Sequence, residues 1–231
     1  MALSPSFEVF EARWTPGENQ LVTARLAADL DTPVSLMLKL ADAQPMSFML
    51  ESVTGGEVRG RYSVVGLKPD VIWDCRGTAS RINGQARFDA EAFEPLPGHP
   101  FDTLRALIAE SRMTMPDGIP AIAAGLFGYL GYDMIRLVER LGEPKPDPIG
   151  VPDAMLMRPT VVAVLDGVKG EVTVCSPAWA ASGLTARAAY AQAAERVMDA
   201  VRDLERSPPG ETRSLGDAAH LSDRAFGAQV E

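Results

Sequence analysis

Residues 47–66 read SFMLESVTGGEVRGRYSVVG, and this stretch restricts the possible folds more than any other part of the chain. An apolar run ends in Glu51 and Ser52, a glycine-rich turn follows, and a second run carries two arginines. This pattern predicts two adjacent strands that bring Glu51, Ser52 and Arg61 close together. Such a corner can hold a zwitterion, since charge-assisted bonds to an ammonium and a carboxylate contribute about 1.5–3 kcal/mol each. An ordinary β-hairpin with a charged, exposed loop would give the same pattern.

Strand patterns dominate the first half of the chain. Alternating apolar residues predict strands over 6–14, 21–30, 46–53, 61–66, 71–75, 80–82 and 85–88. Asn83 and Gly84 predict a tight turn between the last two strands. Thr32 before Pro33 is typical of a helix start, and the helix is predicted over 34–41. The sequence therefore predicts an antiparallel meander with an early helix.

Helices and strands alternate in the second half. Apolar spacing predicts an amphipathic helix from Phe101 to Ile108, a buried strand over 119–124, a helix over 134–141 and a hairpin of 156–165 with 171–175. A long alanine-rich helix is predicted over 184–204. Its expected buried face is Leu184, Ala188, Ala191, Ala194, Met198, Val201 and Leu204. We expect an α+β fold in which helices cover antiparallel β-sheets.

Composition excludes several classes of protein. The 231 residues carry a formal net charge of −9, which disfavours a nucleic-acid or anionic membrane surface because phosphates would be repelled. No apolar run approaches the roughly 20 residues of a membrane helix, and the first residues lack the pattern of a signal peptide. A cytoplasmic protein is expected. Cys75 and Cys175 lie in strand-like surroundings, which indicates buried thiols and not a disulfide or metal pair.

Catalytic and metal motifs are not found in this span. Neither His99 nor His220 has a nucleophile or a zinc-ligand spacing beside it. Paired carboxylates occur at 8/11, 29/31 and 89/91/94, and they are typical of solvated faces or helix caps. Gly125, Gly128 and Gly131 could allow a phosphate to approach the backbone, but their spacing does not fit a dinucleotide fingerprint. The aromatic residues between these glycines favour close backbone packing.

Three segments resemble anthranilate synthase component I, a chorismate-using lyase of tryptophan biosynthesis. Residues 50–63 are similar to the family's tryptophan-binding signature. Residues 29–40 resemble the approach to that signature, and 125–133 resemble the family's glycine-tyrosine segment. The three occur in family order, and a looser similarity extends to Trp179. By this resemblance, Glu51, Ser52 and Arg61 belong to a pocket for tryptophan as a feedback effector.

The resemblance also implies a domain organisation and a set of partners. Residues 1–206 would form the N-terminal regulatory domain, 207–220 a linker, and 221–231 the truncated start of the chorismate-binding catalytic domain. The parent enzyme would use Mg²⁺, with ligands beyond Glu231, and no metal or catalytic residue would lie in this span. Chorismate would bind the missing half, and a glutamine amidotransferase subunit, component II, would supply ammonia. This span alone would therefore be inactive.

Two rival interpretations remain. The large subunit of aminodeoxychorismate synthase shares this fold and part of the motif, although the turn over 55–63 favours anthranilate synthase. A free-standing amino-acid-binding or scaffold domain would have no catalytic half. The gene sequence beyond the codon for Glu231 distinguishes this second rival from the enzyme, since a stop codon there would exclude a catalytic half.

Overall fold

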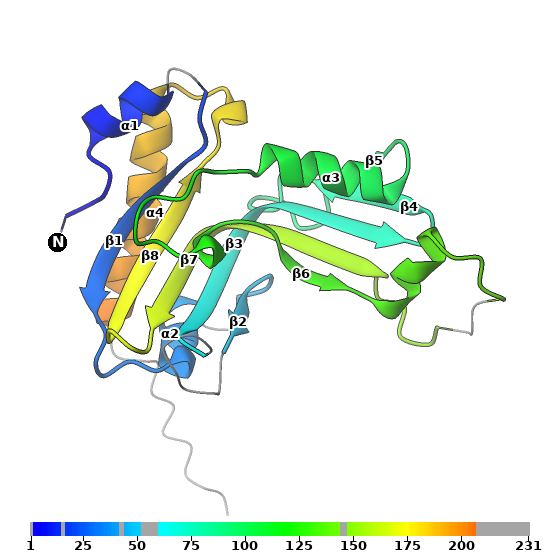
Figure 1. The fold of residues 1–231 in the computed structure, drawn as a ribbon, viewed down its shortest axis with the longest axis horizontal. Helices are drawn as coiled ribbons and strands as arrows, with labels where there is room; N and C mark the ends of the chain where they lie inside the picture. Colours follow the sequence, from blue (N-terminus) through cyan, green and yellow to red (C-terminus); the bar gives the residue numbers. More distant parts are fainter. Residues whose placement is uncertain (1, 15–16, 42–43, 52–59, 144–146, 207–231) are drawn as a thin grey trace, which may run out of the picture.

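The computed structural model describes residues 2–14, 17–41, 44–51, 60–143 and 147–206. Within them the chain folds into two lobes set at an angle (Figure 1). The helices are α1 (Phe7–Trp14), α2 (Pro33–Leu40), α3 (Pro100–Glu110) and α4 (Ala186–Glu205), with 3-10 turns η1 (Ala121–Ala123), η2 (Tyr132–Leu137) and η3 (Ala180–Ser182). The strands are β1 (Gln20–Ala27), β2 (Phe48–Leu50), β3 (Tyr62–Arg76), β4 (Ala79–Asn83), β5 (Glu94–Leu96), β6 (Phe127–Leu130), β7 (Ala154–Asp166) and β8 (Glu171–Ala178).

One antiparallel sheet runs through both lobes. Among the described residues its order is β1-β8-β7-β3-β4-β5, with β2 beside β3 and β6 beside β7. The two long strands, β3 and β7, pair from Tyr62 opposite Asp166 to Cys75 opposite Ala154. We call the part with β1, β8, β2, α1, α2 and α4 the first lobe, and the part with β4, β5, β6 and α3 the second lobe. The α+β prediction, with helices covering an antiparallel sheet, is confirmed.

The sheet bends where two prolines face each other. Pro69 lies opposite Pro159 in the β3–β7 ladder, and the register shifts between Pro69 and Val71. A proline cannot donate to a ladder, and a bulge bends the strand that contains it. Lys68 has a positive φ of 53°, and its carbonyl accepts a 2.6 Å hydrogen bond from the Thr160 hydroxyl. Two separate strands, 61–66 and 71–75, were predicted where β3 is continuous, because Lys68, Pro69 and Asp70 interrupt its apolar pattern.

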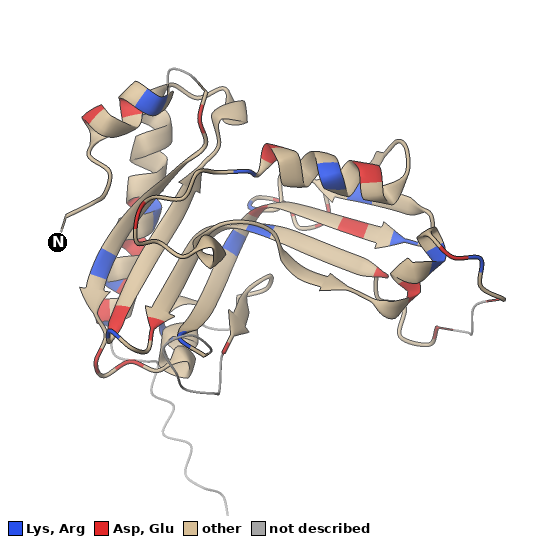
Figure 2. Cartoon of the chain, in the orientation of Figure 1, with Lys and Arg blue, Asp and Glu red and all other residues tan. Residues whose placement is uncertain are grey.

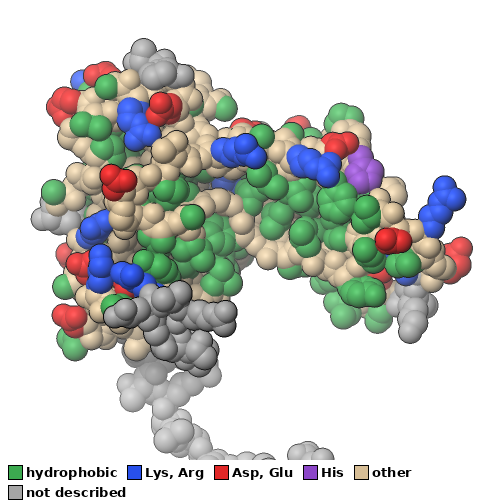
Figure 3. Space-filling view, viewed as in Figure 1, with side chains coloured by type: hydrophobic (Ala, Val, Ile, Leu, Met, Phe, Trp, Pro, Cys, Tyr) green, Lys and Arg blue, Asp and Glu red, His purple; other side chains and the backbone are tan. Residues whose placement is uncertain are grey.

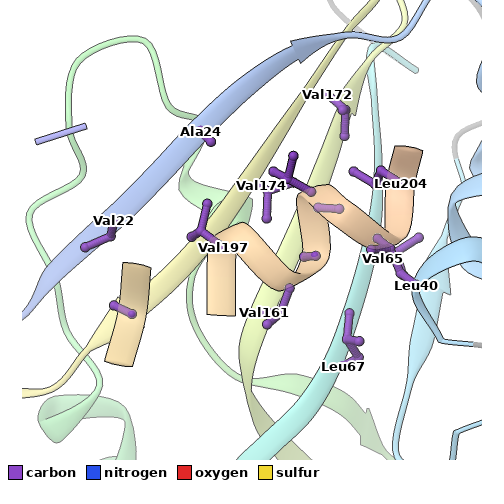
Figure 4. Packing of buried hydrophobic residues seen from close by; sticks show 14 of the residues in the cluster. Val22, Ala24, Leu40, Val65, Leu67, Val161, Val172, Val174, Val197 and Leu204 are labelled. Atoms are coloured by element: carbon purple, nitrogen blue, oxygen red, sulfur yellow. The ribbon is translucent and has the colours of Figure 1, made fainter. Parts of the chain in front are cut away.

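The core of the first lobe lies between α4 and the sheet (Figure 4). Side chains of β1, β3, β7 and β8 meet the buried face of the helix, which consists of Ala189, Ala193, Val197, Ala200, Val201 and Leu204. Val201 and Leu204 are buried as predicted, but Ala191 and Met198 are exposed, so the predicted face was wrong in part. Leu184 lies before the N-cap residue Thr185, and alanines occur on every side of the helix. Apolar spacing alone therefore did not fix the face.

Two predicted strands and one predicted helix are replaced by other structures. Residues 6–14 contain helix α1, whose Phe10 is fully buried and stacks on Trp14 at 5.2 Å. Phe7, Phe10 and Trp14 follow a helical spacing that was mistaken for alternation. Residues 119–124 contain the 3-10 turn η1, in which the Ala123 N–H donates to the Pro120 carbonyl. Residues 132–137 likewise form the 3-10 turn η2 where an α-helix was expected.

The predicted hairpin at Asn83 and Gly84 is also wrong. Residues 85–88 form turns, and β4 pairs with β5 instead. The Asn83 side chain accepts from the Gln85 N–H and donates to the Asp89 carbonyl. These bonds stabilise a longer loop, because an asparagine side chain can replace backbone partners in a turn.

Several other predictions are confirmed. Thr32 caps α2 through a reciprocal capping box with Ser35, and β7 and β8 form the expected hairpin. Cys75 and Cys175 are free, buried thiols, and burial raises the pKa of Cys175 to about 12.

None of the helices in the described ranges has the length and apolar character needed to span a membrane. The linker at 207–220 and the helix start at 221–231 lie outside the described residues.

Candidate functional site

The start of β3 forms a corner with the end of β2. Leu50 of β2 pairs with Val64, and exposed Glu51 follows it directly. Arg61 directly precedes Tyr62, the first residue of β3. Glu51 and Arg61 therefore lie at the same end of the sheet. Ser52, the third predicted site residue, lies outside the described residues.

Arg61 is held by a carboxylate of the neighbouring strand. Its Nε lies 3.0 and 3.1 Å from the two carboxylate oxygens of Asp166, and its Nη2 lies 2.7 Å from Oδ2. The guanidinium also lies over the Tyr62 ring, at 5.1 Å from the centroid. The pair is partly shielded, since 27% of the Arg61 side chain and 12% of the Asp166 side chain are exposed. A fork of this kind fixes the orientation of the guanidinium plane.

Asp166 also organises the turn between β7 and β8. Its Oδ1 accepts from the N–H groups of Val168 and Lys169, at 3.1 and 3.2 Å. The Gly167 N–H donates to the Arg61 carbonyl at 2.9 Å. The hydrogen bonds from Arg61 are the main reason why the pKa of Asp166 is lowered, and the turn N–H groups lower this pKa further. The carboxylate is therefore charged at neutral pH.

An apolar groove begins beside this corner. It has a volume of about 410 Å³ and is lined by Phe48, Leu50, Leu126, Phe127, Gly128, Leu130, Leu156 and Met157. Phe48 of β2 stacks on Phe127 of β6, with centroids 4.6 Å apart. Figure 3 shows hydrophobic side chains gathered in the inner corner between the lobes. The volume lies within the range of about 300–1,000 Å³ that is typical of small-molecule sites.

A second charged cluster lies at the bend of the sheet. Arg158 of β7 is 5% exposed and binds Asp70 through two contacts of 2.9 and 3.2 Å. It also lies 2.9 Å from a carboxylate oxygen of Glu110 and 3.2 Å from the Ser111 hydroxyl, at the end of α3. Its guanidinium lies 4.5 Å from the ring centroid of Trp179. Because α3, the bulge and Trp179, the residue after β8, meet on this side chain, we call the five residues the bend cluster.

Two of the three glycines near β6, Gly128 and Gly131, pack against backbone, whereas Gly125 has no neighbour within 4 Å of where its Cβ would lie. A Cβ at Gly128 would lie 1.9 Å from the Met155 carbonyl oxygen, and one at Gly131 would lie 2.7 Å from that of Asp153. Only a residue without a Cβ permits this approach. The geometry agrees with the close-packing interpretation of Gly128 and Gly131.

Carboxylates elsewhere serve local structure. Asp31 binds Lys39 at 2.7 Å and Ser35 at 2.9 Å, and Asp89 accepts from the Glu91 N–H. In the described ranges, no three His, Cys, Asp or Glu side chains gather closely enough to hold a metal ion. Figure 2 shows blue and red positions interspersed on both lobes of the described chain, without a continuous basic stripe. These observations leave the corner of Glu51 and Arg61 as the candidate site.

Sequence reasoning missed two partners in these clusters. Asp166 was interpreted only as a turn residue, and Arg158 was not singled out. Asp166 lies 105 positions from Arg61, and Arg158 lies 88 positions from Asp70. Strand pairing brings these residues together, and a single sequence carries no local signal for it. The only available hint was an aspartate at the predicted β7–β8 turn, opposite the start of another predicted strand.

Comparisons with known proteins identify the family. No protein-family model matches the chain. The chain is 71% identical over 218 residues to anthranilate synthase component 1 of Cereibacter sphaeroides. This alignment covers 94% of the chain and 43% of that relative. The Synechocystis protein of the same name is 33% identical and covers 92% of the chain and 42% of that relative. The chain thus spans about two fifths of the length of these curated relatives.

A solved structure supports the fold. The crystal structure of anthranilate synthase component I from Streptococcus pneumoniae superposes with a TM-score of 0.53 at 23% sequence identity. The match covers 82% of the chain and 38% of that structure. The chain therefore belongs to the anthranilate synthase component 1 family and matches the N-terminal part of its members.

Proposed function

We propose that the parent protein, meaning the full-length protein whose N-terminal part this chain matches, makes anthranilate and pyruvate from chorismate and ammonia. The 71% identity to a relative named anthranilate synthase component 1 supports this activity. A glutamine amidotransferase, component II, would release the ammonia from glutamine. The reaction would belong to tryptophan biosynthesis and take place in the cytoplasm.

The described chain would be the regulatory part of this protein. We assign residues 1–206 to a tryptophan-sensing domain, 207–220 to a linker and 221–231 to the start of the catalytic domain. The observation that carries this proposal is the placement of a carboxylate, Glu51, and a guanidinium, Arg61, at one end of the sheet beside an apolar groove. Tryptophan has an ammonium, a carboxylate and an indole, which match these three features in charge and polarity.

Catalysis would belong to the remainder of the parent protein. We assign the Mg²⁺ ligands to positions beyond Glu231, on the resemblance to anthranilate synthase component I. The 231-residue chain should make no anthranilate from chorismate, with ammonia or with glutamine and component II. Anthranilate fluorescence above the background of an enzyme-free control would contradict this assignment.

Tryptophan would act by favouring an arrangement of the two halves that cannot complete the active site. Linkage then requires chorismate to weaken tryptophan binding by the same factor by which tryptophan weakens chorismate binding. Calorimetric titration of the parent protein with tryptophan, with and without a saturating chorismate analogue, tests this reciprocity. Equal tryptophan affinity in the two titrations would contradict the mechanism.

Replacement of Ser52 by phenylalanine in the parent protein tests the site. The added ring should fill the pocket, abolish inhibition by tryptophan and leave chorismate turnover largely intact. Ser182→Phe is the matched control, since it adds the same ring at an exposed position of η3, at the opposite end of the first lobe. If Ser52→Phe and the wild type are inhibited at the same tryptophan concentration, the effector site is wrongly placed.

A further inference from the structure

The contacts of Arg61 assign a role to a residue of the neighbouring strand. We infer that Asp166 is a positioning residue for the effector site, which acts by holding the Arg61 guanidinium in the orientation that receives the effector's carboxylate. This inference rests on the proposed tryptophan site. It adds the last residue of β7 to a site whose described members, Glu51 and Arg61, lie directly after β2 and directly before β3.

The first argument is the geometry of the pair. Both Nε and Nη2 of Arg61 face the Asp166 carboxylate, with contacts between 2.7 and 3.1 Å. A guanidinium is planar, so two parallel contacts fix both its position and its plane. A lysine at position 61 could reach the same carboxylate but would not define a plane. Any further contact that Arg61 makes is therefore made from a fixed direction.

The second argument is that Asp166 is itself fixed. Its Oδ1 accepts from the N–H groups of Val168 and Lys169, and the neighbouring Gly167 N–H binds the Arg61 carbonyl. Side chain and backbone of Arg61 are thus both attached to one turn. The carboxylate cannot follow the guanidinium away from the sheet without breaking the bonds of that turn.

The third argument is that the turn lies against a rigid neighbour. The Gly170 carbonyl accepts from the Ala28 N–H at 2.7 Å. A Cβ at Gly170 would lie 2.3 Å from the Asp29 carboxylate, so the loop between β1 and α2 packs tightly on the turn. Asp31 in the same loop is bound to Lys39 of α2. The position of Arg61 is therefore determined by the body of the first lobe.

Shielding makes this pair more effective than a surface ion pair. Only 12% of the Asp166 side chain is exposed, so solvent competes weakly for its oxygens. Without Asp166 the Arg61 guanidinium would lose the contacts that fix its plane, and binding an effector would then have to restore that orientation. Loss of Asp166 should weaken the effector's affinity and leave the chemistry of chorismate unchanged.

The test is a double-mutant cycle in the parent protein with component II. Asp166→Asn keeps an amide oxygen for the turn N–H groups and removes the charge that holds Arg61. We expect it to raise the tryptophan concentration for half-inhibition about tenfold, with kcat and KM for chorismate unchanged. Arg61→Lys should give a smaller rise. In an Arg61→Gln background, Asp166→Asn should have no further effect, because the side chain through which it acts is gone.

Asp74→Asn is the matched control. Asp74 makes a similar two-point contact with Arg81, but it lies in the second lobe, far from the corner. It should lower thermal stability without changing the half-inhibition concentration. The inference is overturned if Asp166→Asn and the wild type are inhibited alike, or if Asp166→Asn has the same effect with and without Arg61. A wild-type protein that tryptophan does not inhibit would overturn the proposed effector site itself.

Discussion

Two arginines hold the long β3–β7 pair, and their surroundings differ. Arg158 at the bend is 5% exposed and is surrounded by two carboxylates, a hydroxyl and an indole from three elements. Arg61 at the open end is bound by the carboxylate of Asp166 in β7, and 27% of its side chain is exposed. The first arginine joins parts of the protein to each other. The second lies at the end of the sheet, beside the apolar groove.

This difference suggests how structure and regulation are divided. A buried arginine whose partners come from both lobes contributes to the angle of the sheet, and its loss leaves carboxylates without a counter-charge. A partly exposed arginine at the end of the sheet adds less to stability, and we expect its main contribution to be to ligand binding. We therefore expect changes at the bend to affect folding and changes at the corner to affect the response to tryptophan.

The largest expected effect is at the bend. Arg158→Met keeps an apolar stem but leaves Asp70 and Glu110 without a partner, so the free energy of unfolding should fall by about 3 kcal/mol. Chemical denaturation of the parent protein measures it. Neutralising one acid as well, in Arg158→Met with Asp70→Asn, should recover part of the loss. An unchanged denaturation midpoint would show that the bend cluster does not support the fold.

The second effect concerns Glu51. Glu51→Ala removes the acceptor that we propose for the ammonium of tryptophan, which should cost roughly 2 kcal/mol or about 30-fold in affinity. Because the side chain is exposed, thermal stability should hardly change. Titration calorimetry of the parent protein measures the affinity. Glu11→Ala, in α1 at the other end of the first lobe, is the control and should bind tryptophan like the wild type.

A smaller effect is expected in the groove. Phe127→Ala removes the ring that stacks on Phe48 at 4.6 Å. If the indole of tryptophan lies in this groove, the affinity should fall about fivefold, as expected for one lost aromatic contact. Phe88→Ala is the control, since that ring is 86% exposed and lies outside the groove. Equal affinities in the two variants would separate the groove from the effector site.

The smallest effect is a pH dependence of stability. The pKa of Asp166 is lowered, mainly by hydrogen bonds from Arg61. Its contribution to stability is therefore complete above the carboxyl's ordinary pKa and is lost as the pH falls through the lower pKa of the folded state. The wild type should exceed Asp166→Asn by about 1 kcal/mol at neutral pH, and the two should converge in acid. Melting curves at several pH values test this, and a constant difference would contradict it.

The sequence predicted local features better than distant ones. The Thr32 cap, the β7–β8 hairpin and the buried cysteines are encoded by neighbouring residues, and all three were found. The face of α4 and the helical nature of α1 were missed, because alanines and aromatics fit more than one period. The pair of Arg61 and Asp166 depends on strands that meet only in the folded chain, so no spacing in the sequence could identify it.

The candidate site was predicted only in part. Glu51 and Arg61 were singled out together, and the structure places them at one end of the sheet. The apolar groove was not predicted, since Phe48 and Phe127 lie on different short strands that stack only because the sheet bends. The bend lies where Pro69 faces Pro159, and Pro159 stands inside the strand predicted over 156–165, so the sequence did not indicate a bend there.

The separation of the bend from the corner can be tested in one measurement. Melting temperature and half-inhibition by tryptophan are determined on the same preparations of wild-type, Arg158→Met and Glu51→Ala parent protein. We predict a lower melting temperature with unchanged half-inhibition for Arg158→Met, and an unchanged melting temperature with a half-inhibition concentration raised about 30-fold for Glu51→Ala. If Glu51→Ala melts early, or is inhibited at the wild-type concentration, the corner is part of the scaffold and not an effector site.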